Sequence, residues 1–380
     1  MSDNRVKIGF LARHPAPYRD AFLALISQSE KLDVKVFLEC SNDAGHLYWD
    51  LPSSRYQSEV LAADKNPSWR VVLKMLRKLV FGGFDYTFWP GFMTGPIIFC
   101  ELVSALAGKK YVICSDTMTS RETSGWRGFL KRFLIKHAAT LIVGGEAGKR
   151  FFSSEYKVEE WRMLEGVYSL NGNALGNEID SLKMRRTELR ARMGIDDTET
   201  IYLMVANMIP KRHYPITIGA FRKFAAQHPG CRFVACGRGD GLAEMQEIAA
   251  RDRSIIVVPG VPFRDMLELY ALADVYVHGG IEPASTALQI GAIAKLPLLS
   301  SKAIGFAWDL LIDGETGVEV ADYKNTEQWF DGFSRILDMR EKWCEMGKKA
   351  RELSVKFDAD VVADKFISFF AKDDRPQLPG

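Results

Sequence analysis

Short apolar runs alternate along the chain with longer segments of helical periodicity. In the first half, the apolar runs predict strands at 6–12, 32–39, 84–90, 109–115 and 140–144. The segments between them favour helices over about 21–27, over 94–107 and from residue 146. Residues 40–66 are polar and favour a long surface loop. Strands that alternate with helices in this way are typical of a doubly wound parallel sheet.

The alternation starts again after residues 165–180, where glycine and asparagine are frequent and favour a linker. Strands are predicted at 201–206, 232–237, 254–260, 274–278 and 296–300. Helices are predicted at 214–227, 241–252, 264–272, 282–294 and 324–340, and then at about 341–354 and 358–371. We therefore expect an α/β protein with two doubly wound, Rossmann-like domains, at 1–170 and 171–357.

Composition and charge agree with this organisation. A chain of 380 residues is longer than a single core usually supports, and 47% hydrophobic with 26% charged residues is typical of soluble globular proteins. The net charge of +2 argues against a general nucleic-acid binder. Residues 1–170 carry 23 Lys and Arg against 18 Asp and Glu, whereas the remainder carries 27 against 30. We therefore expect any anionic partner to meet the first half.

The cysteines and the hydropathy indicate a reducing compartment. The six cysteines are scattered without C-x-x-C spacing, so neither a disulfide framework nor a zinc site is expected. The chain enters its first strand directly, without the pattern of a signal peptide. No apolar run reaches the ~18 residues that a membrane span needs. We expect a cytoplasmic protein that is at most peripheral to the inner face of a membrane.

Residues 274–298 combine a strand, the pair Gly279-Gly280, an acidic residue and a helix expected to begin at Glu282. Free amides and the helix dipole favour a phosphate at such a helix start, and glycines let the backbone approach it closely. Glu282 can accept hydrogen bonds from sugar hydroxyls, and Ser285 and Thr286 add hydroxyl donors. The alternative is an ordinary strand–helix unit of a parallel sheet.

In parallel sheets, ligands bind beyond the carboxyl ends of the strands. In the first half these ends carry His14, Tyr18, Arg19, Trp89, Ser115 and Asp116. The simpler alternatives are that His14 and Arg19 cap a helix or pair with Asp20, and that Asp116 is a helix N-cap.

Two further features of the second half also have a simpler explanation. His278 precedes the glycine pair and is either functional or a satisfied, partly buried histidine. Arg238 and Asp240, in the G-x-G segment, favour surface turn positions over ligand contacts.

Five segments occur in a fixed order in the second half: ANMIPKR (206–212), CGRGDG (236–241), PGVPFRD (259–265), ADVYVHGGIEP (273–283) and DGETG (313–317). In this order they resemble the retaining glycosyltransferases of family 4, of the bacterial polysaccharide and glycolipid type. The resemblance implies the GT-B fold, in which two Rossmann-like domains face a cleft and the final helix, here 358–372, crosses back onto the N-terminal domain. The N-terminal half would bind the acceptor and the C-terminal half the nucleotide-sugar donor.

The resemblance also implies roles for individual residues. The first Glu of the family's E-x7-E motif falls on Glu282, and the family's phosphate-binding Lys falls on Arg212. The phosphate-binding Arg of the family is replaced by Asn207, and the second, ribose-binding Glu by Ile290, next to Gln289. The catalytic side chains expected are Glu282, Arg212 and Asp116, which stands where the family places a His. The expected donor contacts are Asn207, Lys211, Gly237, Val261, Pro262, Ala284, Ser285 and Thr286, and the expected acceptor contacts are His14, Tyr18 and Arg19.

Two helical segments carry basic and aromatic residues together. In residues 69–81, Arg70, Lys74, Arg77 and Lys78 are expected on one face, and Trp69, Val72, Leu73, Leu76 and Val80 on the other. Residues 126–137 repeat the pattern with Arg127, Lys131 and Lys136. Basic amphipathic helices can lie on an anionic membrane surface, although a solvated outer face over a normal core has the same composition.

The sequence therefore favours a glycosyltransferase that moves a sugar from a UDP-, GDP- or other nucleotide-diphosphate donor to a glycan or lipid-linked acceptor. Neither a metal ion nor a cofactor is expected. One alternative is a non-catalytic nucleotide-sugar binding or scaffold protein of the same fold, which the replacements at Asn207 and Ile290 keep open. A sugar-nucleotide epimerase of this fold fits the order of the segments less well.

Overall fold

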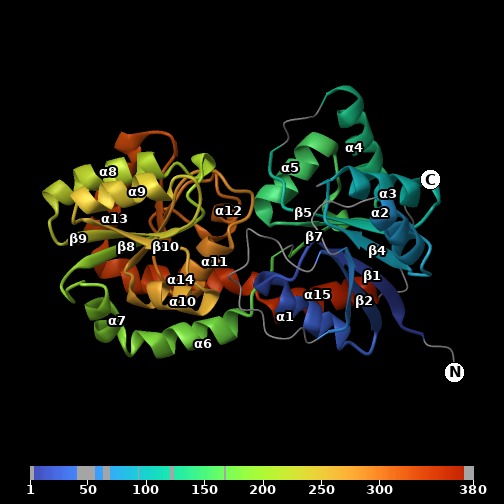
Figure 1. Cartoon of the computed structure of the whole chain (residues 1–380), viewed down its shortest axis with the longest axis horizontal. Coiled ribbons are helices and arrows are strands. Elements are labelled where there is room, and N and C mark those ends of the chain that lie inside the picture. Colours follow the sequence, from blue (N-terminus) through green and yellow to red (C-terminus); the bar gives the residue numbers. More distant parts are fainter. Residues whose placement is uncertain are drawn as a thin grey trace. The chain divides into compact units, whose positions relative to one another are not determined.

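The computed structural model describes residues 4–40, 56–62, 69–92, 94–119, 124–166 and 168–371. The chain divides into two compact units (Figure 1). The first unit contains residues 1–171 and 357–380, and the second contains residues 172–356. Each unit is an α/β structure built on a parallel sheet, so the predicted fold class is confirmed.

The described part of the first unit contains seven strands, β1 (Val6–Ala12), β2 (Leu32–Cys40), β3 (Ser58–Ala62), β4 (Tyr86–Trp89), β5 (Tyr111–Ser115), β6 (Thr140–Val143) and β7 (Met163–Glu165). They are parallel and lie in the order β3-β2-β1-β4-β5-β6-β7. Ile8 of β1 pairs with Val34 of β2 on one side and with Tyr86 of β4 on the other. This central strand is apolar throughout its middle because helices cover both faces of the sheet.

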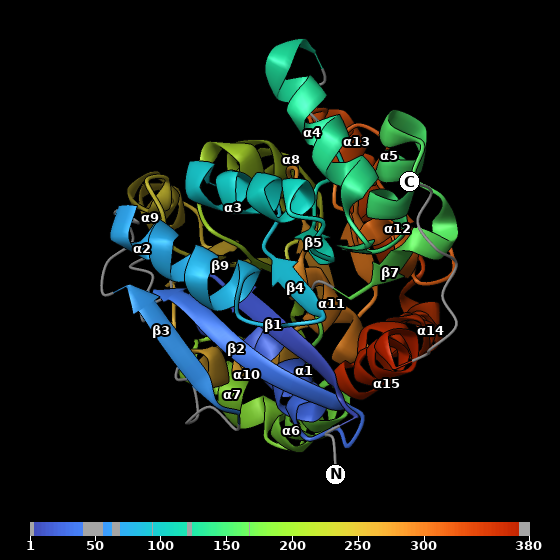
Figure 2. The same ribbon diagram turned by 90° about the vertical axis from the view of Figure 1, so that its right-hand side faces the viewer.

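One face of this sheet is covered by α1 (Pro17–Ser27) and by the last helix, α15 (Ala359–Phe370) (Figure 2). The ring of Phe22 on α1 packs edge-to-face on Phe366 of α15, with centroids 5.3 Å apart. Phe370 packs on Phe88 of β4 at 5.1 Å. The end of the chain therefore completes the core of the first unit.

The opposite face is covered by helices that share one apolar core. They are α2 (Trp69–Met75), continued by a π-helical turn (Leu76–Val80), α3 (Gly95–Leu106), α4 (Gly125–His137) and α5 (Glu146–Tyr156), with a short turn at Glu160–Arg162 before β7. α3 packs against both α2 and α4. The helices lie against the sheet, and the loops that follow β4, β5 and β6 lie at its carboxyl edge.

The apolar face predicted for residues 69–81 is correct in part, because Val80 is buried and Val72 and Leu76 are partly buried against the core. The core is also faced by Val71, Met75 and Leu79, which were not predicted on this face and which recur at every fourth residue. This spacing fits the wider π turn at the end of α2. Trp69 and Leu73, expected on the buried face, are 69% and 51% exposed.

The second unit contains β8 (Thr200–Val205), β9 (Cys231–Gly237), β10 (Ile255–Pro259), β11 (Val275–His278), β12 (Leu298–Ser300) and β13 (Gly317–Glu319). These parallel strands lie in the order β10-β9-β8-β11-β12-β13. The first five strands lie within a few residues of the predicted segments, and β13 was not predicted. β8 and β11 are neighbours at the centre of the sheet, so the loops that follow them meet at its carboxyl edge.

The helices of the second unit are α6 (Gly172–Lys183), α7 (Arg186–Arg192), α8 (Tyr214–Gln227), α9 (Leu242–Arg251), α10 (Phe263–Leu272), α11 (Thr286–Ile293), α12 (Ala307–Leu310), α13 (Thr326–Asp338) and α14 (Trp343–Ser354). Short helical turns lie at Pro210–Arg212, Arg340–Lys342 and Val355–Phe357. On one face of the sheet, Tyr202 of β8 packs edge-to-face on Phe333 of α13, with centroids 5.4 Å apart. An aromatic cluster thus anchors the middle of this unit.

Two predicted loops contain regular structure. The segment 40–66 includes the edge strand β3, in which Val60 pairs with Leu38 of β2, while residues 41–55 and 63–66 lie outside the described residues. The expected linker at 165–180 contains most of α6. In α6, Leu175 and Ile179 are one helical turn apart and both are buried, so amphipathic spacing outweighs the local glycine and asparagine content.

Candidate functional site

The loop after β11 carries Glu282 and leads to α11. The helix begins at Thr286 and not at Glu282 as predicted, with Ser285 as its N-cap: Ser285 Oγ accepts a hydrogen bond of 3.2 Å from the amide of Leu288. Glu282 instead lies in an extended segment. Its amide donates to the carbonyl of Ala303 at 3.2 Å, and its carbonyl accepts from the amide of Gly305 at 2.8 Å. The loop after β12 therefore fixes the backbone of Glu282.

Gly279 and Gly280 are required by the protein's own packing. A Cβ on Gly279 would lie 2.4 Å from Oγ1 of Thr217, and one on Gly280 would lie 2.3 Å from the carbonyl oxygen of Lys211. Gly280 also has φ +83°, a conformation that favours glycine. Because Gly279 and Gly280 have no side chains, the turn that carries Arg212 can pack against them. From the sequence, the glycines were expected to make room for a ligand instead.

Arg212 and Glu282 form an ion pair at this edge. Nη2 of Arg212 donates to Oε1 of Glu282, and Nη1 donates to the carbonyl of Ile281 at 2.9 Å. The side chains are 7% and 21% exposed, respectively. The guanidinium is held in place before any ligand arrives, and the carboxylate remains partly accessible.

His278, at the end of β11, completes the cluster. The imidazole is fully buried; its Nε2 lies 3.0 Å from Oε2 of Glu282, and its Nδ1 lies 2.9 Å from the hydroxyl of Tyr276. A carboxylate can only accept hydrogen bonds, so we assign the proton to Nε2, with Nδ1 accepting from Tyr276. Both ring nitrogens of His278 therefore have hydrogen-bond partners, as the simpler alternative of a satisfied histidine predicts. One of these partners, Glu282, is the candidate sugar-binding residue.

Burial and charge set the ionisation of this cluster. Burial lowers the pKa of His278 below its ordinary value of 6.5, and the hydrogen bond to Glu282 opposes that shift. For Glu282, burial works against ionisation, but the hydrogen bond from His278 and the charge of Arg212 bring its pKa below 4.5. The cluster at neutral pH is therefore a neutral imidazole, a carboxylate and a guanidinium.

The remaining donor-side residues lie on loops that follow neighbouring strands. Asn207 and Lys211 are exposed in the loop after β8. That loop packs on the G-x-G segment, where a Cβ on Gly237 would lie 1.9 Å from the carbonyl oxygen of Ala206. Arg238 donates to the carbonyl of Gly260 at 2.9 Å, which fixes the loop holding Val261 and Pro262. Ala284 and Ser285 are buried before α11, and Thr286 is half-buried.

The position of the second family Glu belongs to the core. Ile290 is 2% exposed, and its neighbour Gln289 is fully buried. Neither side chain is presented at the surface of the second unit.

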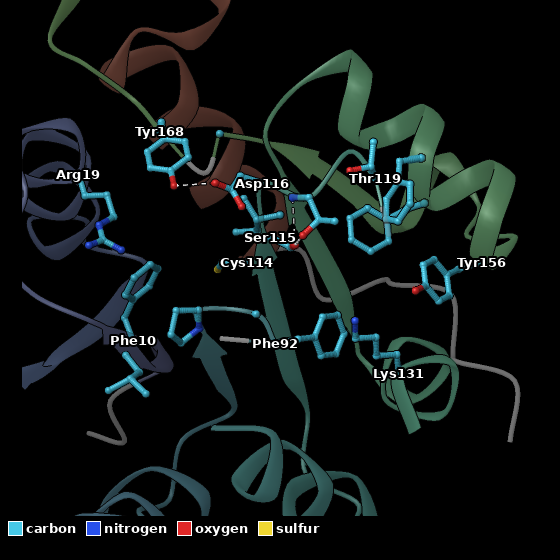
Figure 3. Close-up of a pocket in the computed structure, with 18 of the residues that line it drawn as sticks. Phe10, Arg19, Phe92, Cys114, Ser115, Asp116, Thr119, Lys131, Tyr156 and Tyr168 are labelled. Atoms are coloured by element: carbon cyan, nitrogen blue, oxygen red, sulfur yellow. Dashed lines mark hydrogen bonds between the residues drawn. The ribbon is translucent and has the colours of Figure 1, made fainter. Parts of the chain in front are cut away.

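In the first unit, a pocket of about 340 Å³ lies beside the carboxyl ends of β1, β4, β5 and β6 (Figure 3). Its polar lining includes Arg19, Ser115 and Asp116, which the sequence analysis named. His14 does not line the pocket: it is buried, with Nδ1 2.8 Å from the carbonyl oxygen of Pro15. Tyr18 reaches the site indirectly, since its ring packs edge-to-face on Tyr168, with centroids 4.7 Å apart.

Asp116 is not a helix N-cap. The next helix, α4, begins nine residues later at Gly125, with Ser124 before it. The carboxylate of Asp116 instead accepts a hydrogen bond of 2.9 Å from the hydroxyl of Tyr168. Burial raises the pKa of Tyr168 well above 10.0, and the carboxylate adds to that shift, so the phenol stays a hydrogen-bond donor.

Sequence reasoning did not single out Tyr168, Phe92 or Tyr156, and it counted Lys131 only as part of a basic helix face. Tyr168 lies in the segment taken for a linker, where a lone tyrosine gives no periodic signal. Phe92, Lys131 and Tyr156 come from three different loops and helices, which the fold brings to one pocket.

Two Rossmann-like units with parallel sheets define the GT-B class of proteins. HepE from Anabaena, in a crystal structure with UDP and glucose, shares this fold with a TM-score of 0.72 at 15% identity over 96% of this chain and 99% of that chain. A glycosyltransferase from Rickettsia africae shares it with a TM-score of 0.76 at 13% identity, over 97% and 98%.

Residues 185–353 match the family model described as glycosyl transferases group 1. The matched region contains the whole Arg212–His278–Glu282 cluster. Spore coat protein SA of Bacillus subtilis is 24% identical over 200 residues, which are 50% of this chain. The alignment spans about half of that relative, 52% of its length.

Within the part of the chain that the structure describes, no helix is both long enough and apolar enough to span a membrane.

Proposed function

We propose that the protein is a glycosyltransferase that transfers a sugar, with retention of its anomeric configuration, from a nucleotide-diphosphate sugar to a glycan or lipid-linked acceptor. This activity belongs to polysaccharide or glycoconjugate biosynthesis. The observation that carries the proposal is the hydrogen-bonded cluster of Arg212, Glu282 and His278 at the carboxyl edge of the second sheet. It lies in the region that matches glycosyl transferases group 1.

The second unit would bind the donor. In this reaction a diphosphate leaves while negative charge develops on it, so fixed cations and amides near the phosphates lower the barrier. Lys211 is exposed beside the ion pair, and α11 directs its first amides toward the same edge. Glu282, held ionised by its neighbours, would accept hydrogen bonds from the hydroxyls of the donor sugar.

The first nucleotide to test is UDP. The Anabaena HepE structures contain UDP, UDP with glucose, and UDP-glucose. At 15–16% identity the likeness extends to the fold, so GDP and other nucleotide diphosphates belong in the same test. No cofactor or metal ion is part of the proposal.

The first unit would bind the acceptor in the pocket of Figure 3. Asp116 is the carboxylate of that pocket, and Tyr168 fixes one of its oxygens at 2.9 Å. Asp116 would accept a hydrogen bond from the acceptor hydroxyl. Arg19, whose Nη2 donates to the carbonyl of His14 at 3.1 Å, lies on the same side.

A non-catalytic nucleotide-sugar binding protein is the second candidate. The observation in its favour is Ile290, which replaces a ribose-binding carboxylate by a buried apolar side chain. Such a protein would bind a nucleotide sugar without consuming it. Release of free UDP, or transfer of sugar to any acceptor, would exclude it.

We also propose that the first unit attaches to an anionic membrane surface through α2, α3 and α4. These adjacent helices expose large apolar side chains at Trp69, Leu73, Phe81, Phe99, Leu106, Trp126 and Phe129. Arg70, Arg77, Arg127, Arg132 and Lys136 are exposed on the same helices. Aromatic residues flanked by basic ones are typical of proteins that lie at a membrane interface. A lipid-linked acceptor would be reached at such a surface.

The test of the main proposal is a panel of nucleotides and nucleotide sugars assayed for a shift in melting temperature and for release of the nucleotide diphosphate. A ligand at 100 times its dissociation constant stabilises the folded state by about 2.7 kcal/mol, which gives a measurable shift. We expect one nucleotide diphosphate to stabilise the protein and its sugar conjugate to be consumed. Binding without consumption, with every acceptor tried, would instead support the second candidate.

A further inference from the structure

The pocket of the first unit has two chemically different sides. Arg19 and Asp116 lie near Tyr168, whereas Lys131 lies near Phe92 and Tyr156 (Figure 3). The ammonium of Lys131 is 5.9 Å from the centroid of the Phe92 ring. A ligand that spans the pocket therefore meets a carboxylate at one side and an ammonium at the other.

Hydroxyl-binding groups gather on the Asp116 side. Ser115 Oγ donates to Thr117 Oγ1 at 3.0 Å, and both residues line the pocket with Asp116. A carboxylate has about four acceptor sites on its two oxygens, so Asp116 can accept from ligand hydroxyls in addition to Tyr168. This side is suited to a polyhydroxylated ring.

Several aromatic side chains line the pocket. Phe92, Phe151, Phe152 and Tyr156 all contribute to the lining. Ligand pockets typically combine such apolar walls with a few placed polar groups, and flat rings offer the C–H face of a sugar a large contact area. The pocket volume of about 340 Å³ is within the usual range for small ligands.

The charge of the pocket lining favours some sugars over others. Among the described residues that line the pocket, the cations are Arg19 and Lys131 and the carboxylate is Asp116, so the lining is net positive. A neutral sugar can accept a hydrogen bond from the Lys131 ammonium through a hydroxyl oxygen but brings no opposite charge to it. A phosphate or carboxylate substituent would form a charge-assisted hydrogen bond with it, which is stronger than a neutral one.

We propose that this pocket binds a sugar carrying an anionic substituent, phosphate or carboxylate, with a hydroxyl directed to Asp116 and the anion directed to Lys131. The inference rests on the proposed function, because it names the chemical class of the acceptor. Lys131 is then the residue that determines specificity, and Asp116 contacts the reacting hydroxyl.

The test is a titration of the full chain with common hexoses, each in its neutral form, as its 6-phosphate and as its uronic acid. We expect at least one anionic form to bind about tenfold or more tightly than the neutral form of the same sugar. The arms with phosphate and with uronate identify the anion. Inorganic phosphate is a further arm: if it binds as tightly as the sugar phosphate, the sugar part of the inference is wrong.

The variants are Lys131→Met, which removes the charge, and Lys131→Arg, which keeps it. The matched control is Lys109→Met, which is in the same unit but exposed and outside the pocket lining. We expect the preference for the anionic form to vanish in Lys131→Met and to remain in the other two. Equal binding of neutral and anionic sugars by the wild type, an unchanged preference in Lys131→Met, or no binding of any sugar overturns the inference.

Nucleotide-diphosphate binding, measured on the same proteins, separates this inference from the proposed function. Lys131 belongs to the first unit, so Lys131→Met should leave that binding unchanged. An intact anionic preference in a protein that binds no nucleotide diphosphate would reject the donor function alone. Nucleotide-diphosphate binding in a protein without the anionic preference would reject the acceptor class alone.

Discussion

His278 and Glu282 are joined by a hydrogen bond of 3.0 Å between Nε2 and Oε2, although one ends a strand and the other lies in the following loop. The buried imidazole also accepts a hydrogen bond from the hydroxyl of Tyr276, so its orientation is fixed. Glu282 is thereby held from one side by a neutral donor and from the other by the Arg212 guanidinium. The carboxylate that would contact the donor sugar is positioned before the sugar binds.

This arrangement predicts that acid destabilises the protein through His278. Its pKa in the folded state is below 6.5, so as the pH falls below about 6.5 the unfolded chain takes up a proton that the folded chain does not. Stability is lost down to the lowered pKa, by up to about 1.4 kcal/mol per pH unit. His278→Gln removes this titration, so its unfolding free energy should fall less between pH 7 and pH 5. Urea unfolding at three pH values checks this, and parallel pH profiles would contradict it.

A second prediction concerns Glu282→Gln. The contacts of this carboxylate with the donor sugar orient the anomeric carbon as the diphosphate leaves, so they matter more to transfer than to nucleotide affinity. We expect the transfer rate to fall by about a hundredfold or more, with nucleotide-diphosphate binding changed only a few-fold. Glu327→Gln, an exposed carboxylate of the same unit, is the control. An unchanged transfer rate in Glu282→Gln would place the sugar elsewhere.

Lys211 and Arg212 should differ in what they contribute. Lys211 is exposed, so Lys211→Ala should weaken nucleotide-diphosphate binding about tenfold without altering stability. Arg212 is buried against Glu282, so Arg212→Ala should weaken diphosphate binding about ten- to a hundredfold and also lower the unfolding free energy by about 1–3 kcal/mol. Nucleoside binding should change little in either variant. Calorimetry with UDP and uridine, together with urea unfolding, makes the comparison; equal losses for both ligands would show that neither cation meets the phosphates.

Membrane attachment is tested with charge reversals that spare internal contacts. Lys74 donates to the carbonyl of Leu61, and Lys78 pairs with Glu59, so the exposed Arg70 and Arg77 are the better positions. Each basic residue near an anionic surface contributes about 1 kcal/mol, so Arg70→Glu with Arg77→Glu should lower vesicle binding at least about tenfold at low salt. The control is Lys342→Glu with Lys348→Glu in the second unit. Sedimentation with anionic vesicles gives the answer, and wild-type protein that stays in the supernatant would reject the proposal.

Most strands of both sheets were predictable because their signals are local, whereas the edge strands β3, β7 and β13 were not predicted. β1 and β8 are continuous apolar runs, as buried parallel strands must be, and each is followed by a helical period. The start of α11 was not predictable from such a signal. The backbone of Glu282 is held by Ala303 and Gly305, more than twenty residues away, and this pairing prevents the helix from beginning there.

The candidate site was predictable where a motif gave positions or where a residue follows a predicted strand, as Arg19, Ser115 and Asp116 do. Arg212 and Glu282 are 70 residues apart, and the order of the family segments placed both of them. The partnership of Asp116 with Tyr168 spans 52 residues and depends on how the end of β7 returns to β5. No periodic pattern in the sequence indicates that contact. Lys131 likewise gains a candidate role only from the tertiary position of α4.

The last prediction concerns Glu101, which lies in α3 with its side chain fully buried. Neither of its carboxyl oxygens has a hydrogen-bond partner among the described residues, and burial raises its pKa well above 4.5. The folded chain therefore keeps a proton that the unfolded chain releases above about pH 4.5, so this group lowers stability as the pH rises toward its folded pKa. Glu101→Gln, which has nearly the same shape and no charge, should be more stable than wild type at pH 7–8, and the gain should vanish near pH 4. Unfolding free energies of both proteins at pH 4, 6 and 8 measure it, and Glu155→Gln, at an exposed position of the same unit, is the control. A difference between Glu101→Gln and wild type that does not change with pH would mean that the Glu101 carboxyl ionises alike in both states.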